Sequence, residues 1–510
     1  MLSFITPNEQ ELLQRIAALA EREGMPLRVV GGFVRDRLLQ AANRLPVPPK
    51  PEMDFVTTGD ALKLAELVAT IFPHARHYQY GHFGTARVDW KEWMFEFATA
   101  RTESYQSDSR NPDVVASTFE EDAARRDFTV NALAWGVNGA ENGVLFDPFG
   151  GVRDLEQGIL RTPLDPGKTF SDDPLRMMRA ARFVAKLNFS IDPVTENGIT
   201  ENAARIEIVH VERIADELLQ TLAAPFPHLG IDVLFRTGVL TYILPEIVEL
   251  HGVDQRGKHS HKDVYTHTLQ VLENASTLSN DIAVRLSALF HDIAKPQTKK
   301  FLPEIGWTFY GHEVLGVRSI NRVFRRLRLS NLLAKRVGKI TRLHMRPVRL
   351  AQEGVTDSAI RRLRVEAGEE LEALLQLCRA DITSANPKRV EKYLKNYQTM
   401  LQRLDLVEKR DHLSSFQSPV RGEEIAELCG IPFGPRIGMI KTAIEEAILD
   451  GVIPNEYEPA KVWLLENRER LLSEPEQRIR KKSLEQLDEK QVERLLQAVK
   501  ESHEQSESNE

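Results

Sequence analysis

A two-glycine turn between an apolar strand and the start of a helix constrains this chain more than any other feature of its sequence. The segment reads Leu27-Arg28-Val29-Val30-Gly31-Gly32-Phe33-Val34-Arg35-Asp36. Paired glycines carry no Cβ, so their backbone N–H groups can approach a phosphate closely. The N-terminus of the following helix also favours an anion. The segment therefore predicts a strand–turn–helix unit that binds phosphate.

Acidic residues follow this turn on further predicted strands. Glu52 and Asp54 are two positions apart, so both side chains point to one face of a strand and can hold one cation. Glu96 lies between two phenylalanines, where a carboxylate is costly unless it is paired, metal-bound or on the wet face of an edge strand. A phosphate-binding turn with carboxylates for divalent metals is typical of nucleotidyl transfer. We predict Glu52, Asp54 and Glu96 as catalytic carboxylates, with Glu52 and Asp54 binding Mg²⁺.

Two later motifs suit a nucleotide. The segment Arg125–Ala134 places guanidinium groups, an aspartate and an asparagine before an apolar strand, and such groups suit phosphate and ribose contacts. Asp173 and Arg176 are three residues apart at a helix start, so they share one face. They can form a helix-capping ion pair. They can also read a base, because the carboxylate accepts from an exocyclic amine while the guanidinium donates to a neighbouring acceptor.

This donor–acceptor pattern fits cytosine and adenine. Guanine and uracil present the opposite pattern at the matching edge, and each buried mismatched group costs ~1–3 kcal/mol. The pair Asp173 and Arg176 could therefore select C and A without a nucleic-acid template.

The predicted strands lie early in the 510-residue chain, at residues 28–30, 53–56, 85–90, 93–99 and 132–137. After about Leu160 only helical periodicity remains. The expected fold class is therefore α+β, with an α+β head followed by a long all-α body. No apolar run has the length of a membrane span, and the acidic N-terminus excludes a secretory signal. The two cysteines, Cys378 and Cys429, indicate no disulfide framework, so a cytoplasmic location is expected.

The charge pattern points to one local basic region. The net charge of −7 excludes binding of a polyanion by the charge of the whole protein. Between Arg318 and Arg349, however, the chain carries no acidic residue. Such a run forms either a solvated helix face or a surface for RNA. The predicted RNA-binding residues are Arg322, Arg325, Arg326, Lys335, Arg336 and Lys339.

In their order along the chain, the motifs of the head resemble those of class II tRNA nucleotidyltransferases, the bacterial-type CCA-adding enzymes and their poly(A) polymerase relatives. The matching segments are Gly31–Asp36, Glu52–Asp54, Arg125–Ala132, Asp147–Asp154, Asp172–Ala180 and Glu212–Ile214. The resemblance implies a polymerase-β-like head, a helical neck, and a helical body and tail that bind tRNA. It implies CTP and ATP as substrates and nucleotide contacts from Gly31, Gly32, Arg35, Arg126, Asp127, Asn131, Asp173, Arg176 and Arg179.

The chain departs from the pattern of this family at two positions. The family usually has aspartate at the first metal position, where this chain has Glu52. Glutamate is one methylene longer, so either the backbone is set back there or the metal geometry differs. Asp172 stands where the family has glutamate in the base-selection motif, which is a milder change because its neighbours match. The segment Asp147–Asp154 is expected to form a turn-rich, mobile loop.

A second constellation lies in residues 251–381. Its members are His267, His291, Asp292, His312, His344 and Asp381, on consecutive predicted helices. Their order resembles that of the HD phosphohydrolase superfamily. Imidazole and carboxylate ligands suit a divalent metal, and a metal-bound hydroxide can attack a phosphoester. The resemblance implies phosphatase or cyclic-phosphodiesterase action on RNA 3′ ends, or an HD fold kept only to bind RNA.

These patterns predict five regions. They are a nucleotidyltransferase head at residues 1–158, a helical neck for nucleotide selection and RNA binding at 159–250, an HD domain at 251–385, a helical tRNA-binding region at 386–472, and a charged tail, helical or disordered, at 473–510. The predicted function is addition of CCA to tRNA from CTP and ATP with release of pyrophosphate, together with an HD phosphohydrolase activity. Three alternatives remain open: a poly(A) polymerase or CC- or A-adding enzyme, an HD phosphohydrolase whose inactive head binds RNA (with Glu52 as the sign of decay), and an RNA chaperone.

Overall fold

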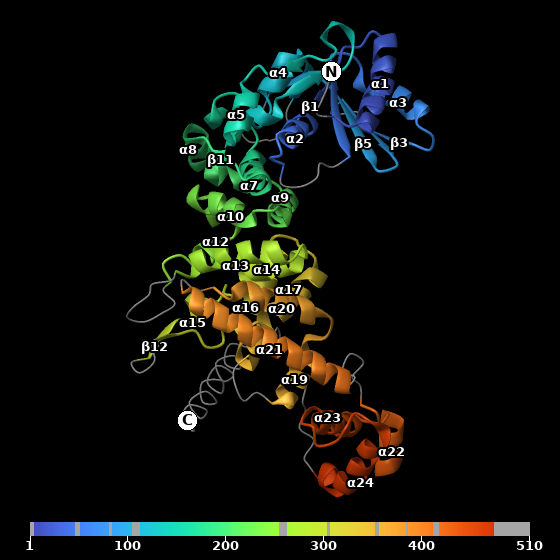
Figure 1. Cartoon of the computed structure of the whole chain (residues 1–510), viewed down its shortest axis with the longest axis vertical. Coiled ribbons are helices and arrows are strands. Elements are labelled where there is room, and N and C mark those ends of the chain that lie inside the picture. Colours follow the sequence, from blue (N-terminus) through green and yellow to red (C-terminus); the bar gives the residue numbers. More distant parts are fainter. Residues whose placement is uncertain are drawn as a thin grey trace. The chain divides into compact units, whose positions relative to one another are not determined.

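The computed structural model describes residues 5–45, 51–80, 84–104, 113–253, 263–302, 306–351, 356–383, 386–411 and 418–473. The chain divides into two compact units, Met1–Pro245 and Glu246–Glu510 (Figure 1). Within the described ranges, no helix is both long and apolar enough to traverse a lipid bilayer. The predicted charged tail, from residue 474 onward, lies outside the described residues.

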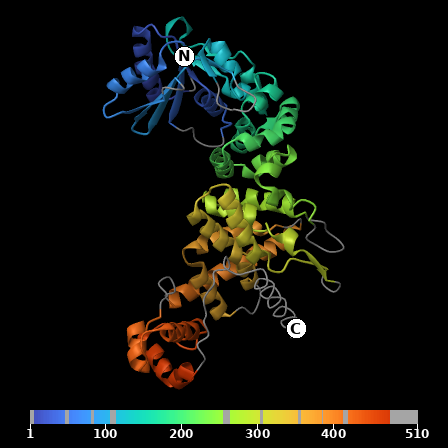
Figure 2. The same ribbon diagram turned by 180° about the vertical axis from the view of Figure 1, so that it is seen from behind.

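A seven-stranded sheet forms the centre of the head, and its arrows lie in the blue and cyan part of the chain (Figure 2). The strand order is β3-β4-β5-β2-β1-β8-β9, in which β2 and β5 are parallel and the other neighbours antiparallel. The strands are β1 (Leu27–Val30), β2 (Glu52–Thr57), β3 (Arg76–Tyr80), β4 (Thr85–Trp90), β5 (Trp93–Thr99), β8 (Ala134–Gly136) and β9 (Leu145–Phe146). Strand β5 lies inside the sheet, so the expected edge position of Glu96 is wrong, but Glu96 is exposed, so the expected wet face of this strand is confirmed.

Strand alternation separates a buried face of this sheet from an open one. On β2, Met53 and Phe55 point into the hydrophobic core, and the ring of Phe55 stacks on that of Phe97 with 5.1 Å between centroids. Helices α1 (Pro7–Arg22) and α3 (Ala61–Ile71) contribute apolar residues to this core. Glu52 and Asp54 alternate with Met53 and Phe55 along β2 and therefore face the other side of the sheet.

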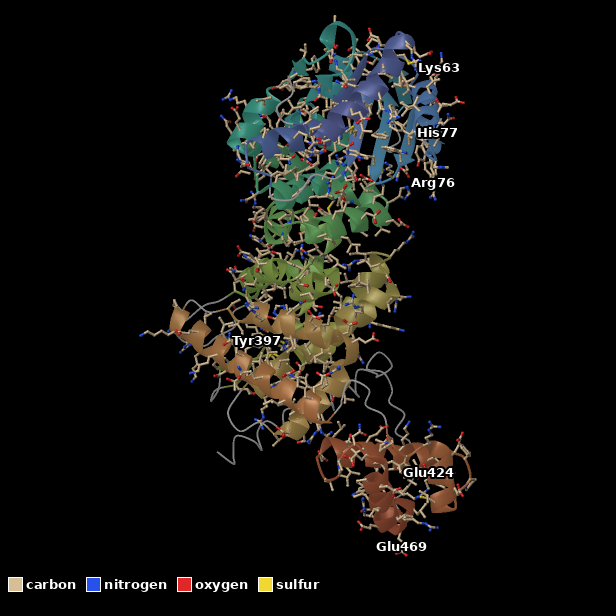
Figure 3. The ribbon with its side chains drawn as sticks, turned by 45° about the vertical axis from the view of Figure 1, so that its right-hand side comes forward. Lys63, Arg76, His77, Tyr397, Glu424 and Glu469 are labelled. Atoms are coloured by element: carbon tan, nitrogen blue, oxygen red, sulfur yellow. The ribbon has the colours of Figure 1, made fainter. Side chains whose placement is uncertain are left out.

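Strand β3 forms one edge of this sheet. Sequence analysis did not predict it, because its residues are exposed on both faces and show no apolar alternation. Arg76 and His77 are labelled on this edge strand in Figure 3; Arg76 is exposed, whereas His77 is half-buried. Two further strands of the head, β6 (Arg101–Ser104) and β7 (Asp113–Ala116), pair with each other in a separate ribbon.

Helices complete the first unit, and two of its segments differ from expectation. The turn-rich segment before Asp154 runs into helix α5 (Gly151–Gln157), which begins where Asp147 accepts hydrogen bonds from the N–H groups of Gly151 and Val152 at 2.6 and 3.0 Å. Strand β10 (Ile159–Leu160) pairs with β11 (Ser190–Ile191), beyond the predicted end of strand structure. The remaining helices are α2 (Gly32–Ala41), α4 (Phe119–Ala124), the 3₁₀ turn η2 (Thr129–Asn131), α6 (Pro166–Asp172), α7 (Leu175–Leu187), α8 (Pro193–Asn202), α9 (Val211–Ala223), α10 (Pro227–Arg236) and α11 (Val239–Ile243). Helix α12 (Pro245–Val248) begins at the last residue of this unit and continues into the second.

In the part of the second unit that the structure describes, helices predominate, and the strands β12 (Lys300–Leu302) and β13 (Gly306–Thr308) form a hairpin, which was also unpredicted. Helices α22, α23 and α24 share an apolar core of their own, which includes Ile425, Ile440 and Leu464. The helices are α13 (Val264–Leu278), α14 (Ile282–Phe290), α15 (Lys295–Thr298), α16 (His312–Arg326), α17 (Asn331–Leu343), α18 (Met345–Leu350), α19 (Asp357–Ala367), α20 (Leu371–Asp381), α21 (Pro387–Asp411), α22 (Gly422–Cys429), α23 (Pro435–Leu449) and α24 (Tyr457–Ser473).

Candidate active site and metal centre

The glycine turn lies directly beside an acidic and a basic side chain. Gly31 has a φ of 66°, which an L side chain rarely adopts, and it stands immediately before α2. A Cβ on Gly31 would lie 3.1 Å from Nη1 of Arg126 and 3.9 Å from Oδ2 of Asp54. A Cβ on Gly32 would lie 3.6 Å from Nη2 of Arg35. Side chains larger than hydrogen would therefore crowd this corner of the site.

The register of the sheet aligns two of the three predicted head carboxylates. Asp54 on β2 is the direct partner of Glu96 on β5, and Glu52 lies two residues earlier on the face of Asp54. Asp54 and Glu96 line a pocket of about 280 Å³ together with Arg87 and Arg126. The head carboxylates are more widely spaced than a closed metal site. Among the residues the structure describes, the groups whose ligand atoms all lie within 4.8 Å of one another are in the second unit.

The environment of these carboxylates disfavours their charge. Burial raises the pKa of Asp54 to about 6, and the neighbouring Glu96 adds to this effect while Arg126 opposes it. Burial also raises the pKa of Glu96; Arg87 opposes this effect, while Glu52 and Asp89 add to it. Carboxylates that disfavour one another's ionisation fit a divalent cation, whose charge would favour their ionised form. The residues present therefore fit a hard divalent ion such as Mg²⁺.

Four of the predicted nucleotide-binding residues form one hydrogen-bonded chain. Arg35 on α2 donates to Asp36 at 2.7 Å and to the side-chain oxygen of Asn131. Asn131 donates to Asp127 at 2.9 Å, and Arg179 on α7 donates to the other oxygen of Asp127 at 2.8 Å. This chain holds α2, η2 and α7 in fixed relation around the glycine turn.

Asp127 is the charged centre of this chain. Burial alone would raise its pKa, but the Arg179 guanidinium and the Asn131 amide outweigh burial and lower the pKa to about 2. Its ionised form is therefore favoured in the folded protein, which links the stability of the head to pH.

We predict that Asp127→Asn destabilises the head and removes part of its pH dependence. The folded-state pKa is below the ordinary value of 3.8, so the stabilising effect is complete above about pH 5 and is lost as the pH falls toward 2. The lowered pKa corresponds to about 2 kcal/mol, and loss of a buried ion-pair partner costs about 3–5 kcal/mol. Urea unfolding of both proteins at pH 7 and pH 3 measures this effect. Equal pH dependence in both proteins would contradict it.

Two other predicted residues, Arg126 and Arg176, are held by nearby oxygen atoms. Asp122 on α4 lies 3.1 Å from a guanidinium nitrogen of Arg126. Arg176 is buried and donates to the carbonyl oxygens of Arg125 at 2.7 Å and Thr169 at 3.4 Å. Asp173 accepts a hydrogen bond from the N–H of Leu175 at 3.3 Å, at the start of α7. Asp122 was not among the predicted residues, although its spacing from Arg126 is that of a helical ion pair.

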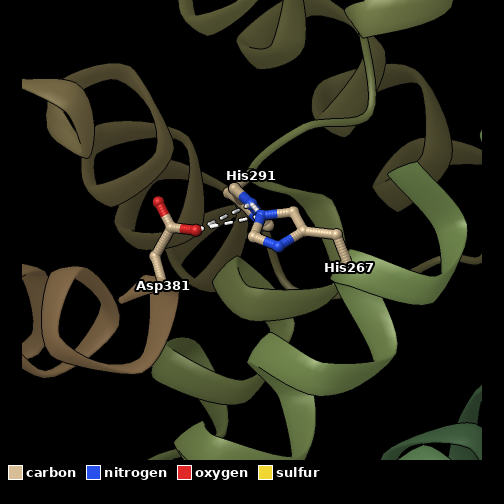
Figure 4. A group of neighbouring side chains, drawn as sticks. All are labelled: His267, His291 and Asp381. Carbon is tan, nitrogen blue, oxygen red and sulfur yellow. Dashed lines mark hydrogen bonds and ion pairs between the residues drawn. The ribbon is translucent and has the colours of Figure 1, made fainter. Parts of the chain in front are cut away.

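The six residues of the second constellation gather in two groups. His267, His291 and Asp381 form one group, and Asp292, His312 and His344 form the other. In the first group, drawn in Figure 4, Nε2 of His267 lies 3.3 Å from Nε2 of His291 and 3.0 Å from Asp381. In the second group, Nε2 of His312 lies 3.4 Å from Nε2 of His344 and 3.5 Å from Asp292.

In three of these histidines Nδ1 points away from the other ligands and toward a backbone carbonyl, which leaves Nε2 facing the other ligands. Nδ1 of His291, His312 and His344 lies 2.9, 2.8 and 2.6 Å from the carbonyl oxygens of Ala288, Phe309 and Thr341. A carbonyl only accepts, so each Nδ1 carries a proton, and in its neutral form each ring turns an Nε2 lone pair inward. Facing lone pairs at 3.4 Å, as in His312 and His344, repel unless a cation lies between them. The donor set therefore fits a divalent metal.

The charge environment favours the neutral form of His312 and His344, whereas for His291 burial, which would lower the pKa, is outweighed by Asp292 and the pKa is raised. Burial lowers the pKa of His312, and it lowers the pKa of His344 to about 3 with help from His312 and His291. Despite burial, His291, Lys295 and His312 hold the pKa of Asp292 well below its ordinary value. Lys295 lies 2.7 Å from Asp292 and was not predicted, although its spacing from Asp292 places it on the same helical turn.

Two residues of the basic run between Arg318 and Arg349 form ion pairs with carboxylates from other parts of the second unit. Arg326 makes two 2.7 Å hydrogen bonds to Glu246. Arg336 lies 2.8 Å from both Glu370 and Asp281. These carboxylates offset the charge of two predicted RNA-binding residues. The other four lie on the same two helices: Arg322 and Arg325 on α16 and Lys335 and Lys339 on α17.

The head and the second constellation together define a class of protein: a nucleotidyltransferase joined to an HD domain. Family models match the same parts of the chain. They are the poly A polymerase head domain over residues 27–161, the "Probable RNA and SrmB- binding site of polymerase A" over residues 188–250, and the HD domain over residues 264–386.

Individual relatives narrow this class. A multifunctional CCA protein of Nitrosococcus oceani is 36% identical over 378 residues, covering 70% of this chain and 84% of the relative. An A-adding tRNA nucleotidyltransferase of Deinococcus radiodurans is 34% identical over 338 residues, covering 64% and 75%. The Bacillus stearothermophilus CCA-adding enzyme in complex with CTP has a TM-score of 0.65 at 27% identity, covering 91% and 99%. The chain belongs to the family of tRNA nucleotidyltransferases that includes the CCA-adding enzymes.

Proposed function

We propose that this protein adds CCA to the 3′ end of tRNA from CTP and ATP and releases pyrophosphate. The observation that carries the proposal is the head site, in which the Gly31 turn, Arg126 and the paired carboxylates Asp54 and Glu96 meet. It is supported by 36% identity to a multifunctional CCA protein and by likeness to a CCA-adding enzyme that binds CTP.

Each part of the site has a role in this proposal. Glu52, Asp54 and Glu96 would hold Mg²⁺, and the bound ion would supply activation of the attacking hydroxyl and neutralisation of the triphosphate charge. The N–H groups of Gly31 and Gly32 bind phosphate. The chain through Arg35, Asn131, Asp127 and Arg179 positions the nucleotide. Asp173 and Arg176 select the base. The five regions expected from the sequence, from the head at 1–158 to the tail at 473–510, and a cytoplasmic location belong to the same proposal.

The assay that tests this function offers CTP and ATP, separately, to tRNA that lacks its three terminal residues and to tRNA that ends in one or two of the C residues. We expect CTP incorporation into tRNA lacking all three terminal residues, and ATP incorporation only after two C residues are present. ATP alone should not extend the first RNA. Because one relative is an A-adding enzyme, incorporation of A without C would replace the proposal with that activity, and long A tails would replace it with poly(A) synthesis.

A second candidate function follows from the second unit. Nε2 of His291 and of His312 lie 3.1 and 3.5 Å from the buried Asp292, and Nε2 of His344 lies 3.4 Å from that of His312. We propose that this centre binds one or two divalent metals and hydrolyses phosphate groups at RNA 3′ ends. Arg322, Arg325, Lys335 and Lys339 attract the RNA backbone.

A further inference from the structure

The open face of the head sheet continues from the carboxylates to an exposed edge. Direct strand partners run from Asp54 to Glu96, from Glu96 to Arg87 and from Arg87 to Tyr78, across β2, β5, β4 and β3. Directly opposite residues of neighbouring strands point to the same face. Tyr78 therefore stands on the face of Asp54, three strands away, which is about 14 Å at a strand spacing of about 4.8 Å.

Two more residues of β3 extend this face. Residues two positions apart on a strand point the same way, so Arg76 and Tyr80 lie on the side of Tyr78. Tyr78 is 40% exposed and Tyr80 is 50% exposed. Tyr80 also lines the pocket that contains Asp54 and Glu96. The aromatic edge and the carboxylates are thus parts of one continuous surface within the head.

The chemistry of this edge suits a single-stranded nucleic acid. Bases stack on exposed tyrosine rings with little regard to sequence, and guanidinium groups attract the phosphates between them. Arg87 is oriented by Asp89, which accepts hydrogen bonds from its Nε at 2.6 Å and its Nη2 at 3.0 Å. The distance of about 14 Å between Asp54 and Tyr78 corresponds to a few stacked nucleotides, each about 3.4 Å along its strand.

We propose that Tyr78 and Tyr80 form a stacking platform for the 3′-terminal bases of the RNA that accepts the new nucleotide. Arg87 and Arg76 contact the phosphates of that RNA. This inference rests on the proposed nucleotide addition and deepens it, because it assigns a place in the site to the acceptor strand as distinct from the incoming nucleotide.

The test compares KM for RNA with KM for nucleotide in single-addition assays. We expect the double variant Tyr78→Ala/Tyr80→Ala to raise KM for RNA at least tenfold, since each lost base stack weakens binding about 5- to 150-fold. Its KM for ATP should stay within twofold. The pair Tyr78→Phe/Tyr80→Phe keeps both rings and should retain the original KM. Gln79→Ala, on the same strand but the opposite face, is the matched control.

Several outcomes overturn the inference. An RNA KM in the alanine pair equal to that of Gln79→Ala means that no base rests on these rings. An equal rise in KM for ATP assigns the rings to the nucleotide instead. If the alanine pair unfolds, Tyr78→Leu/Tyr80→Leu supplies apolar bulk without flat rings, and unchanged RNA affinity in that pair also overturns the platform. Absence of nucleotide addition by the unmodified protein would instead refute the proposed function.

Discussion

Asp54→Ala is expected to abolish nucleotide incorporation while phosphohydrolysis by the second unit continues. Asp54 lies next to the glycine turn, pairs with Glu96 across the sheet and lines the head pocket. Removal of one carboxylate from a divalent-metal site costs several kcal/mol of transition-state stabilisation, and about 4 kcal/mol corresponds to a thousandfold lower kcat. Single-turnover incorporation of labelled CTP into tRNA that lacks its terminal CCA measures the effect.

Two further variants make this prediction sharp. Asp54→Asn keeps the shape of the side chain but removes its charge, so it should lose nearly as much activity as the alanine variant. Glu92→Gln removes a carboxylate from the exposed turn between β4 and β5, and should retain full incorporation. If Asp54→Ala incorporates CTP at the original rate, the head is not the polymerising centre, and its role would be that of an RNA-binding module.

Local patterns in the head were sufficient to predict which side chains share a face. The period of two on β2 separates Glu52 and Asp54 from the buried Met53, and Gly31 occupies a left-handed conformation that the strand–turn–helix pattern requires. Which strands become neighbours was beyond such patterns. The pairing of β2 with β5 joins residues about forty positions apart, and it depends on the packing of the whole core. For the same reason β3, which buries little, left no periodic signal.

Ion-pair partners that are far away in sequence also limited what the run of basic residues could predict. Arg326 pairs with Glu246, 80 residues earlier, and Arg336 pairs with Glu370, 34 residues later. A run without acidic residues therefore does not show that its charges face solvent. The geometry of the second constellation was equally hidden: Asp292 lies 3.1 Å from the adjacent His291 and 3.5 Å from His312, so it connects the two groups of ligands.

His291→Ala combined with Asp292→Ala is expected to remove bound divalent metal and metal-dependent hydrolysis from the second unit, with incorporation by the head retained. The two residues serve different groups, so the double change takes one ligand from each. Asp292 also faces Lys295 and His312, which would lose their shared carboxylate. Loss of a metal-bound nucleophile should reduce hydrolysis at least a hundredfold. Metal content by elemental analysis and release of phosphate from RNA with a 2′,3′-cyclic end are the two measurements.

Because His291 and Asp292 are buried, a second variant must separate loss of metal from loss of fold. Asp381→Asn changes a carboxylate that is 19% exposed and nearly preserves its volume, so the helices around it should stay folded while the first group loses a charged ligand. His251→Ala removes an exposed histidine outside both groups and should leave hydrolysis unchanged. Full metal content and hydrolysis in the double variant would refute the metal centre. Equal loss of hydrolysis and incorporation, with folding intact, would instead mean that the six residues support the action of the head.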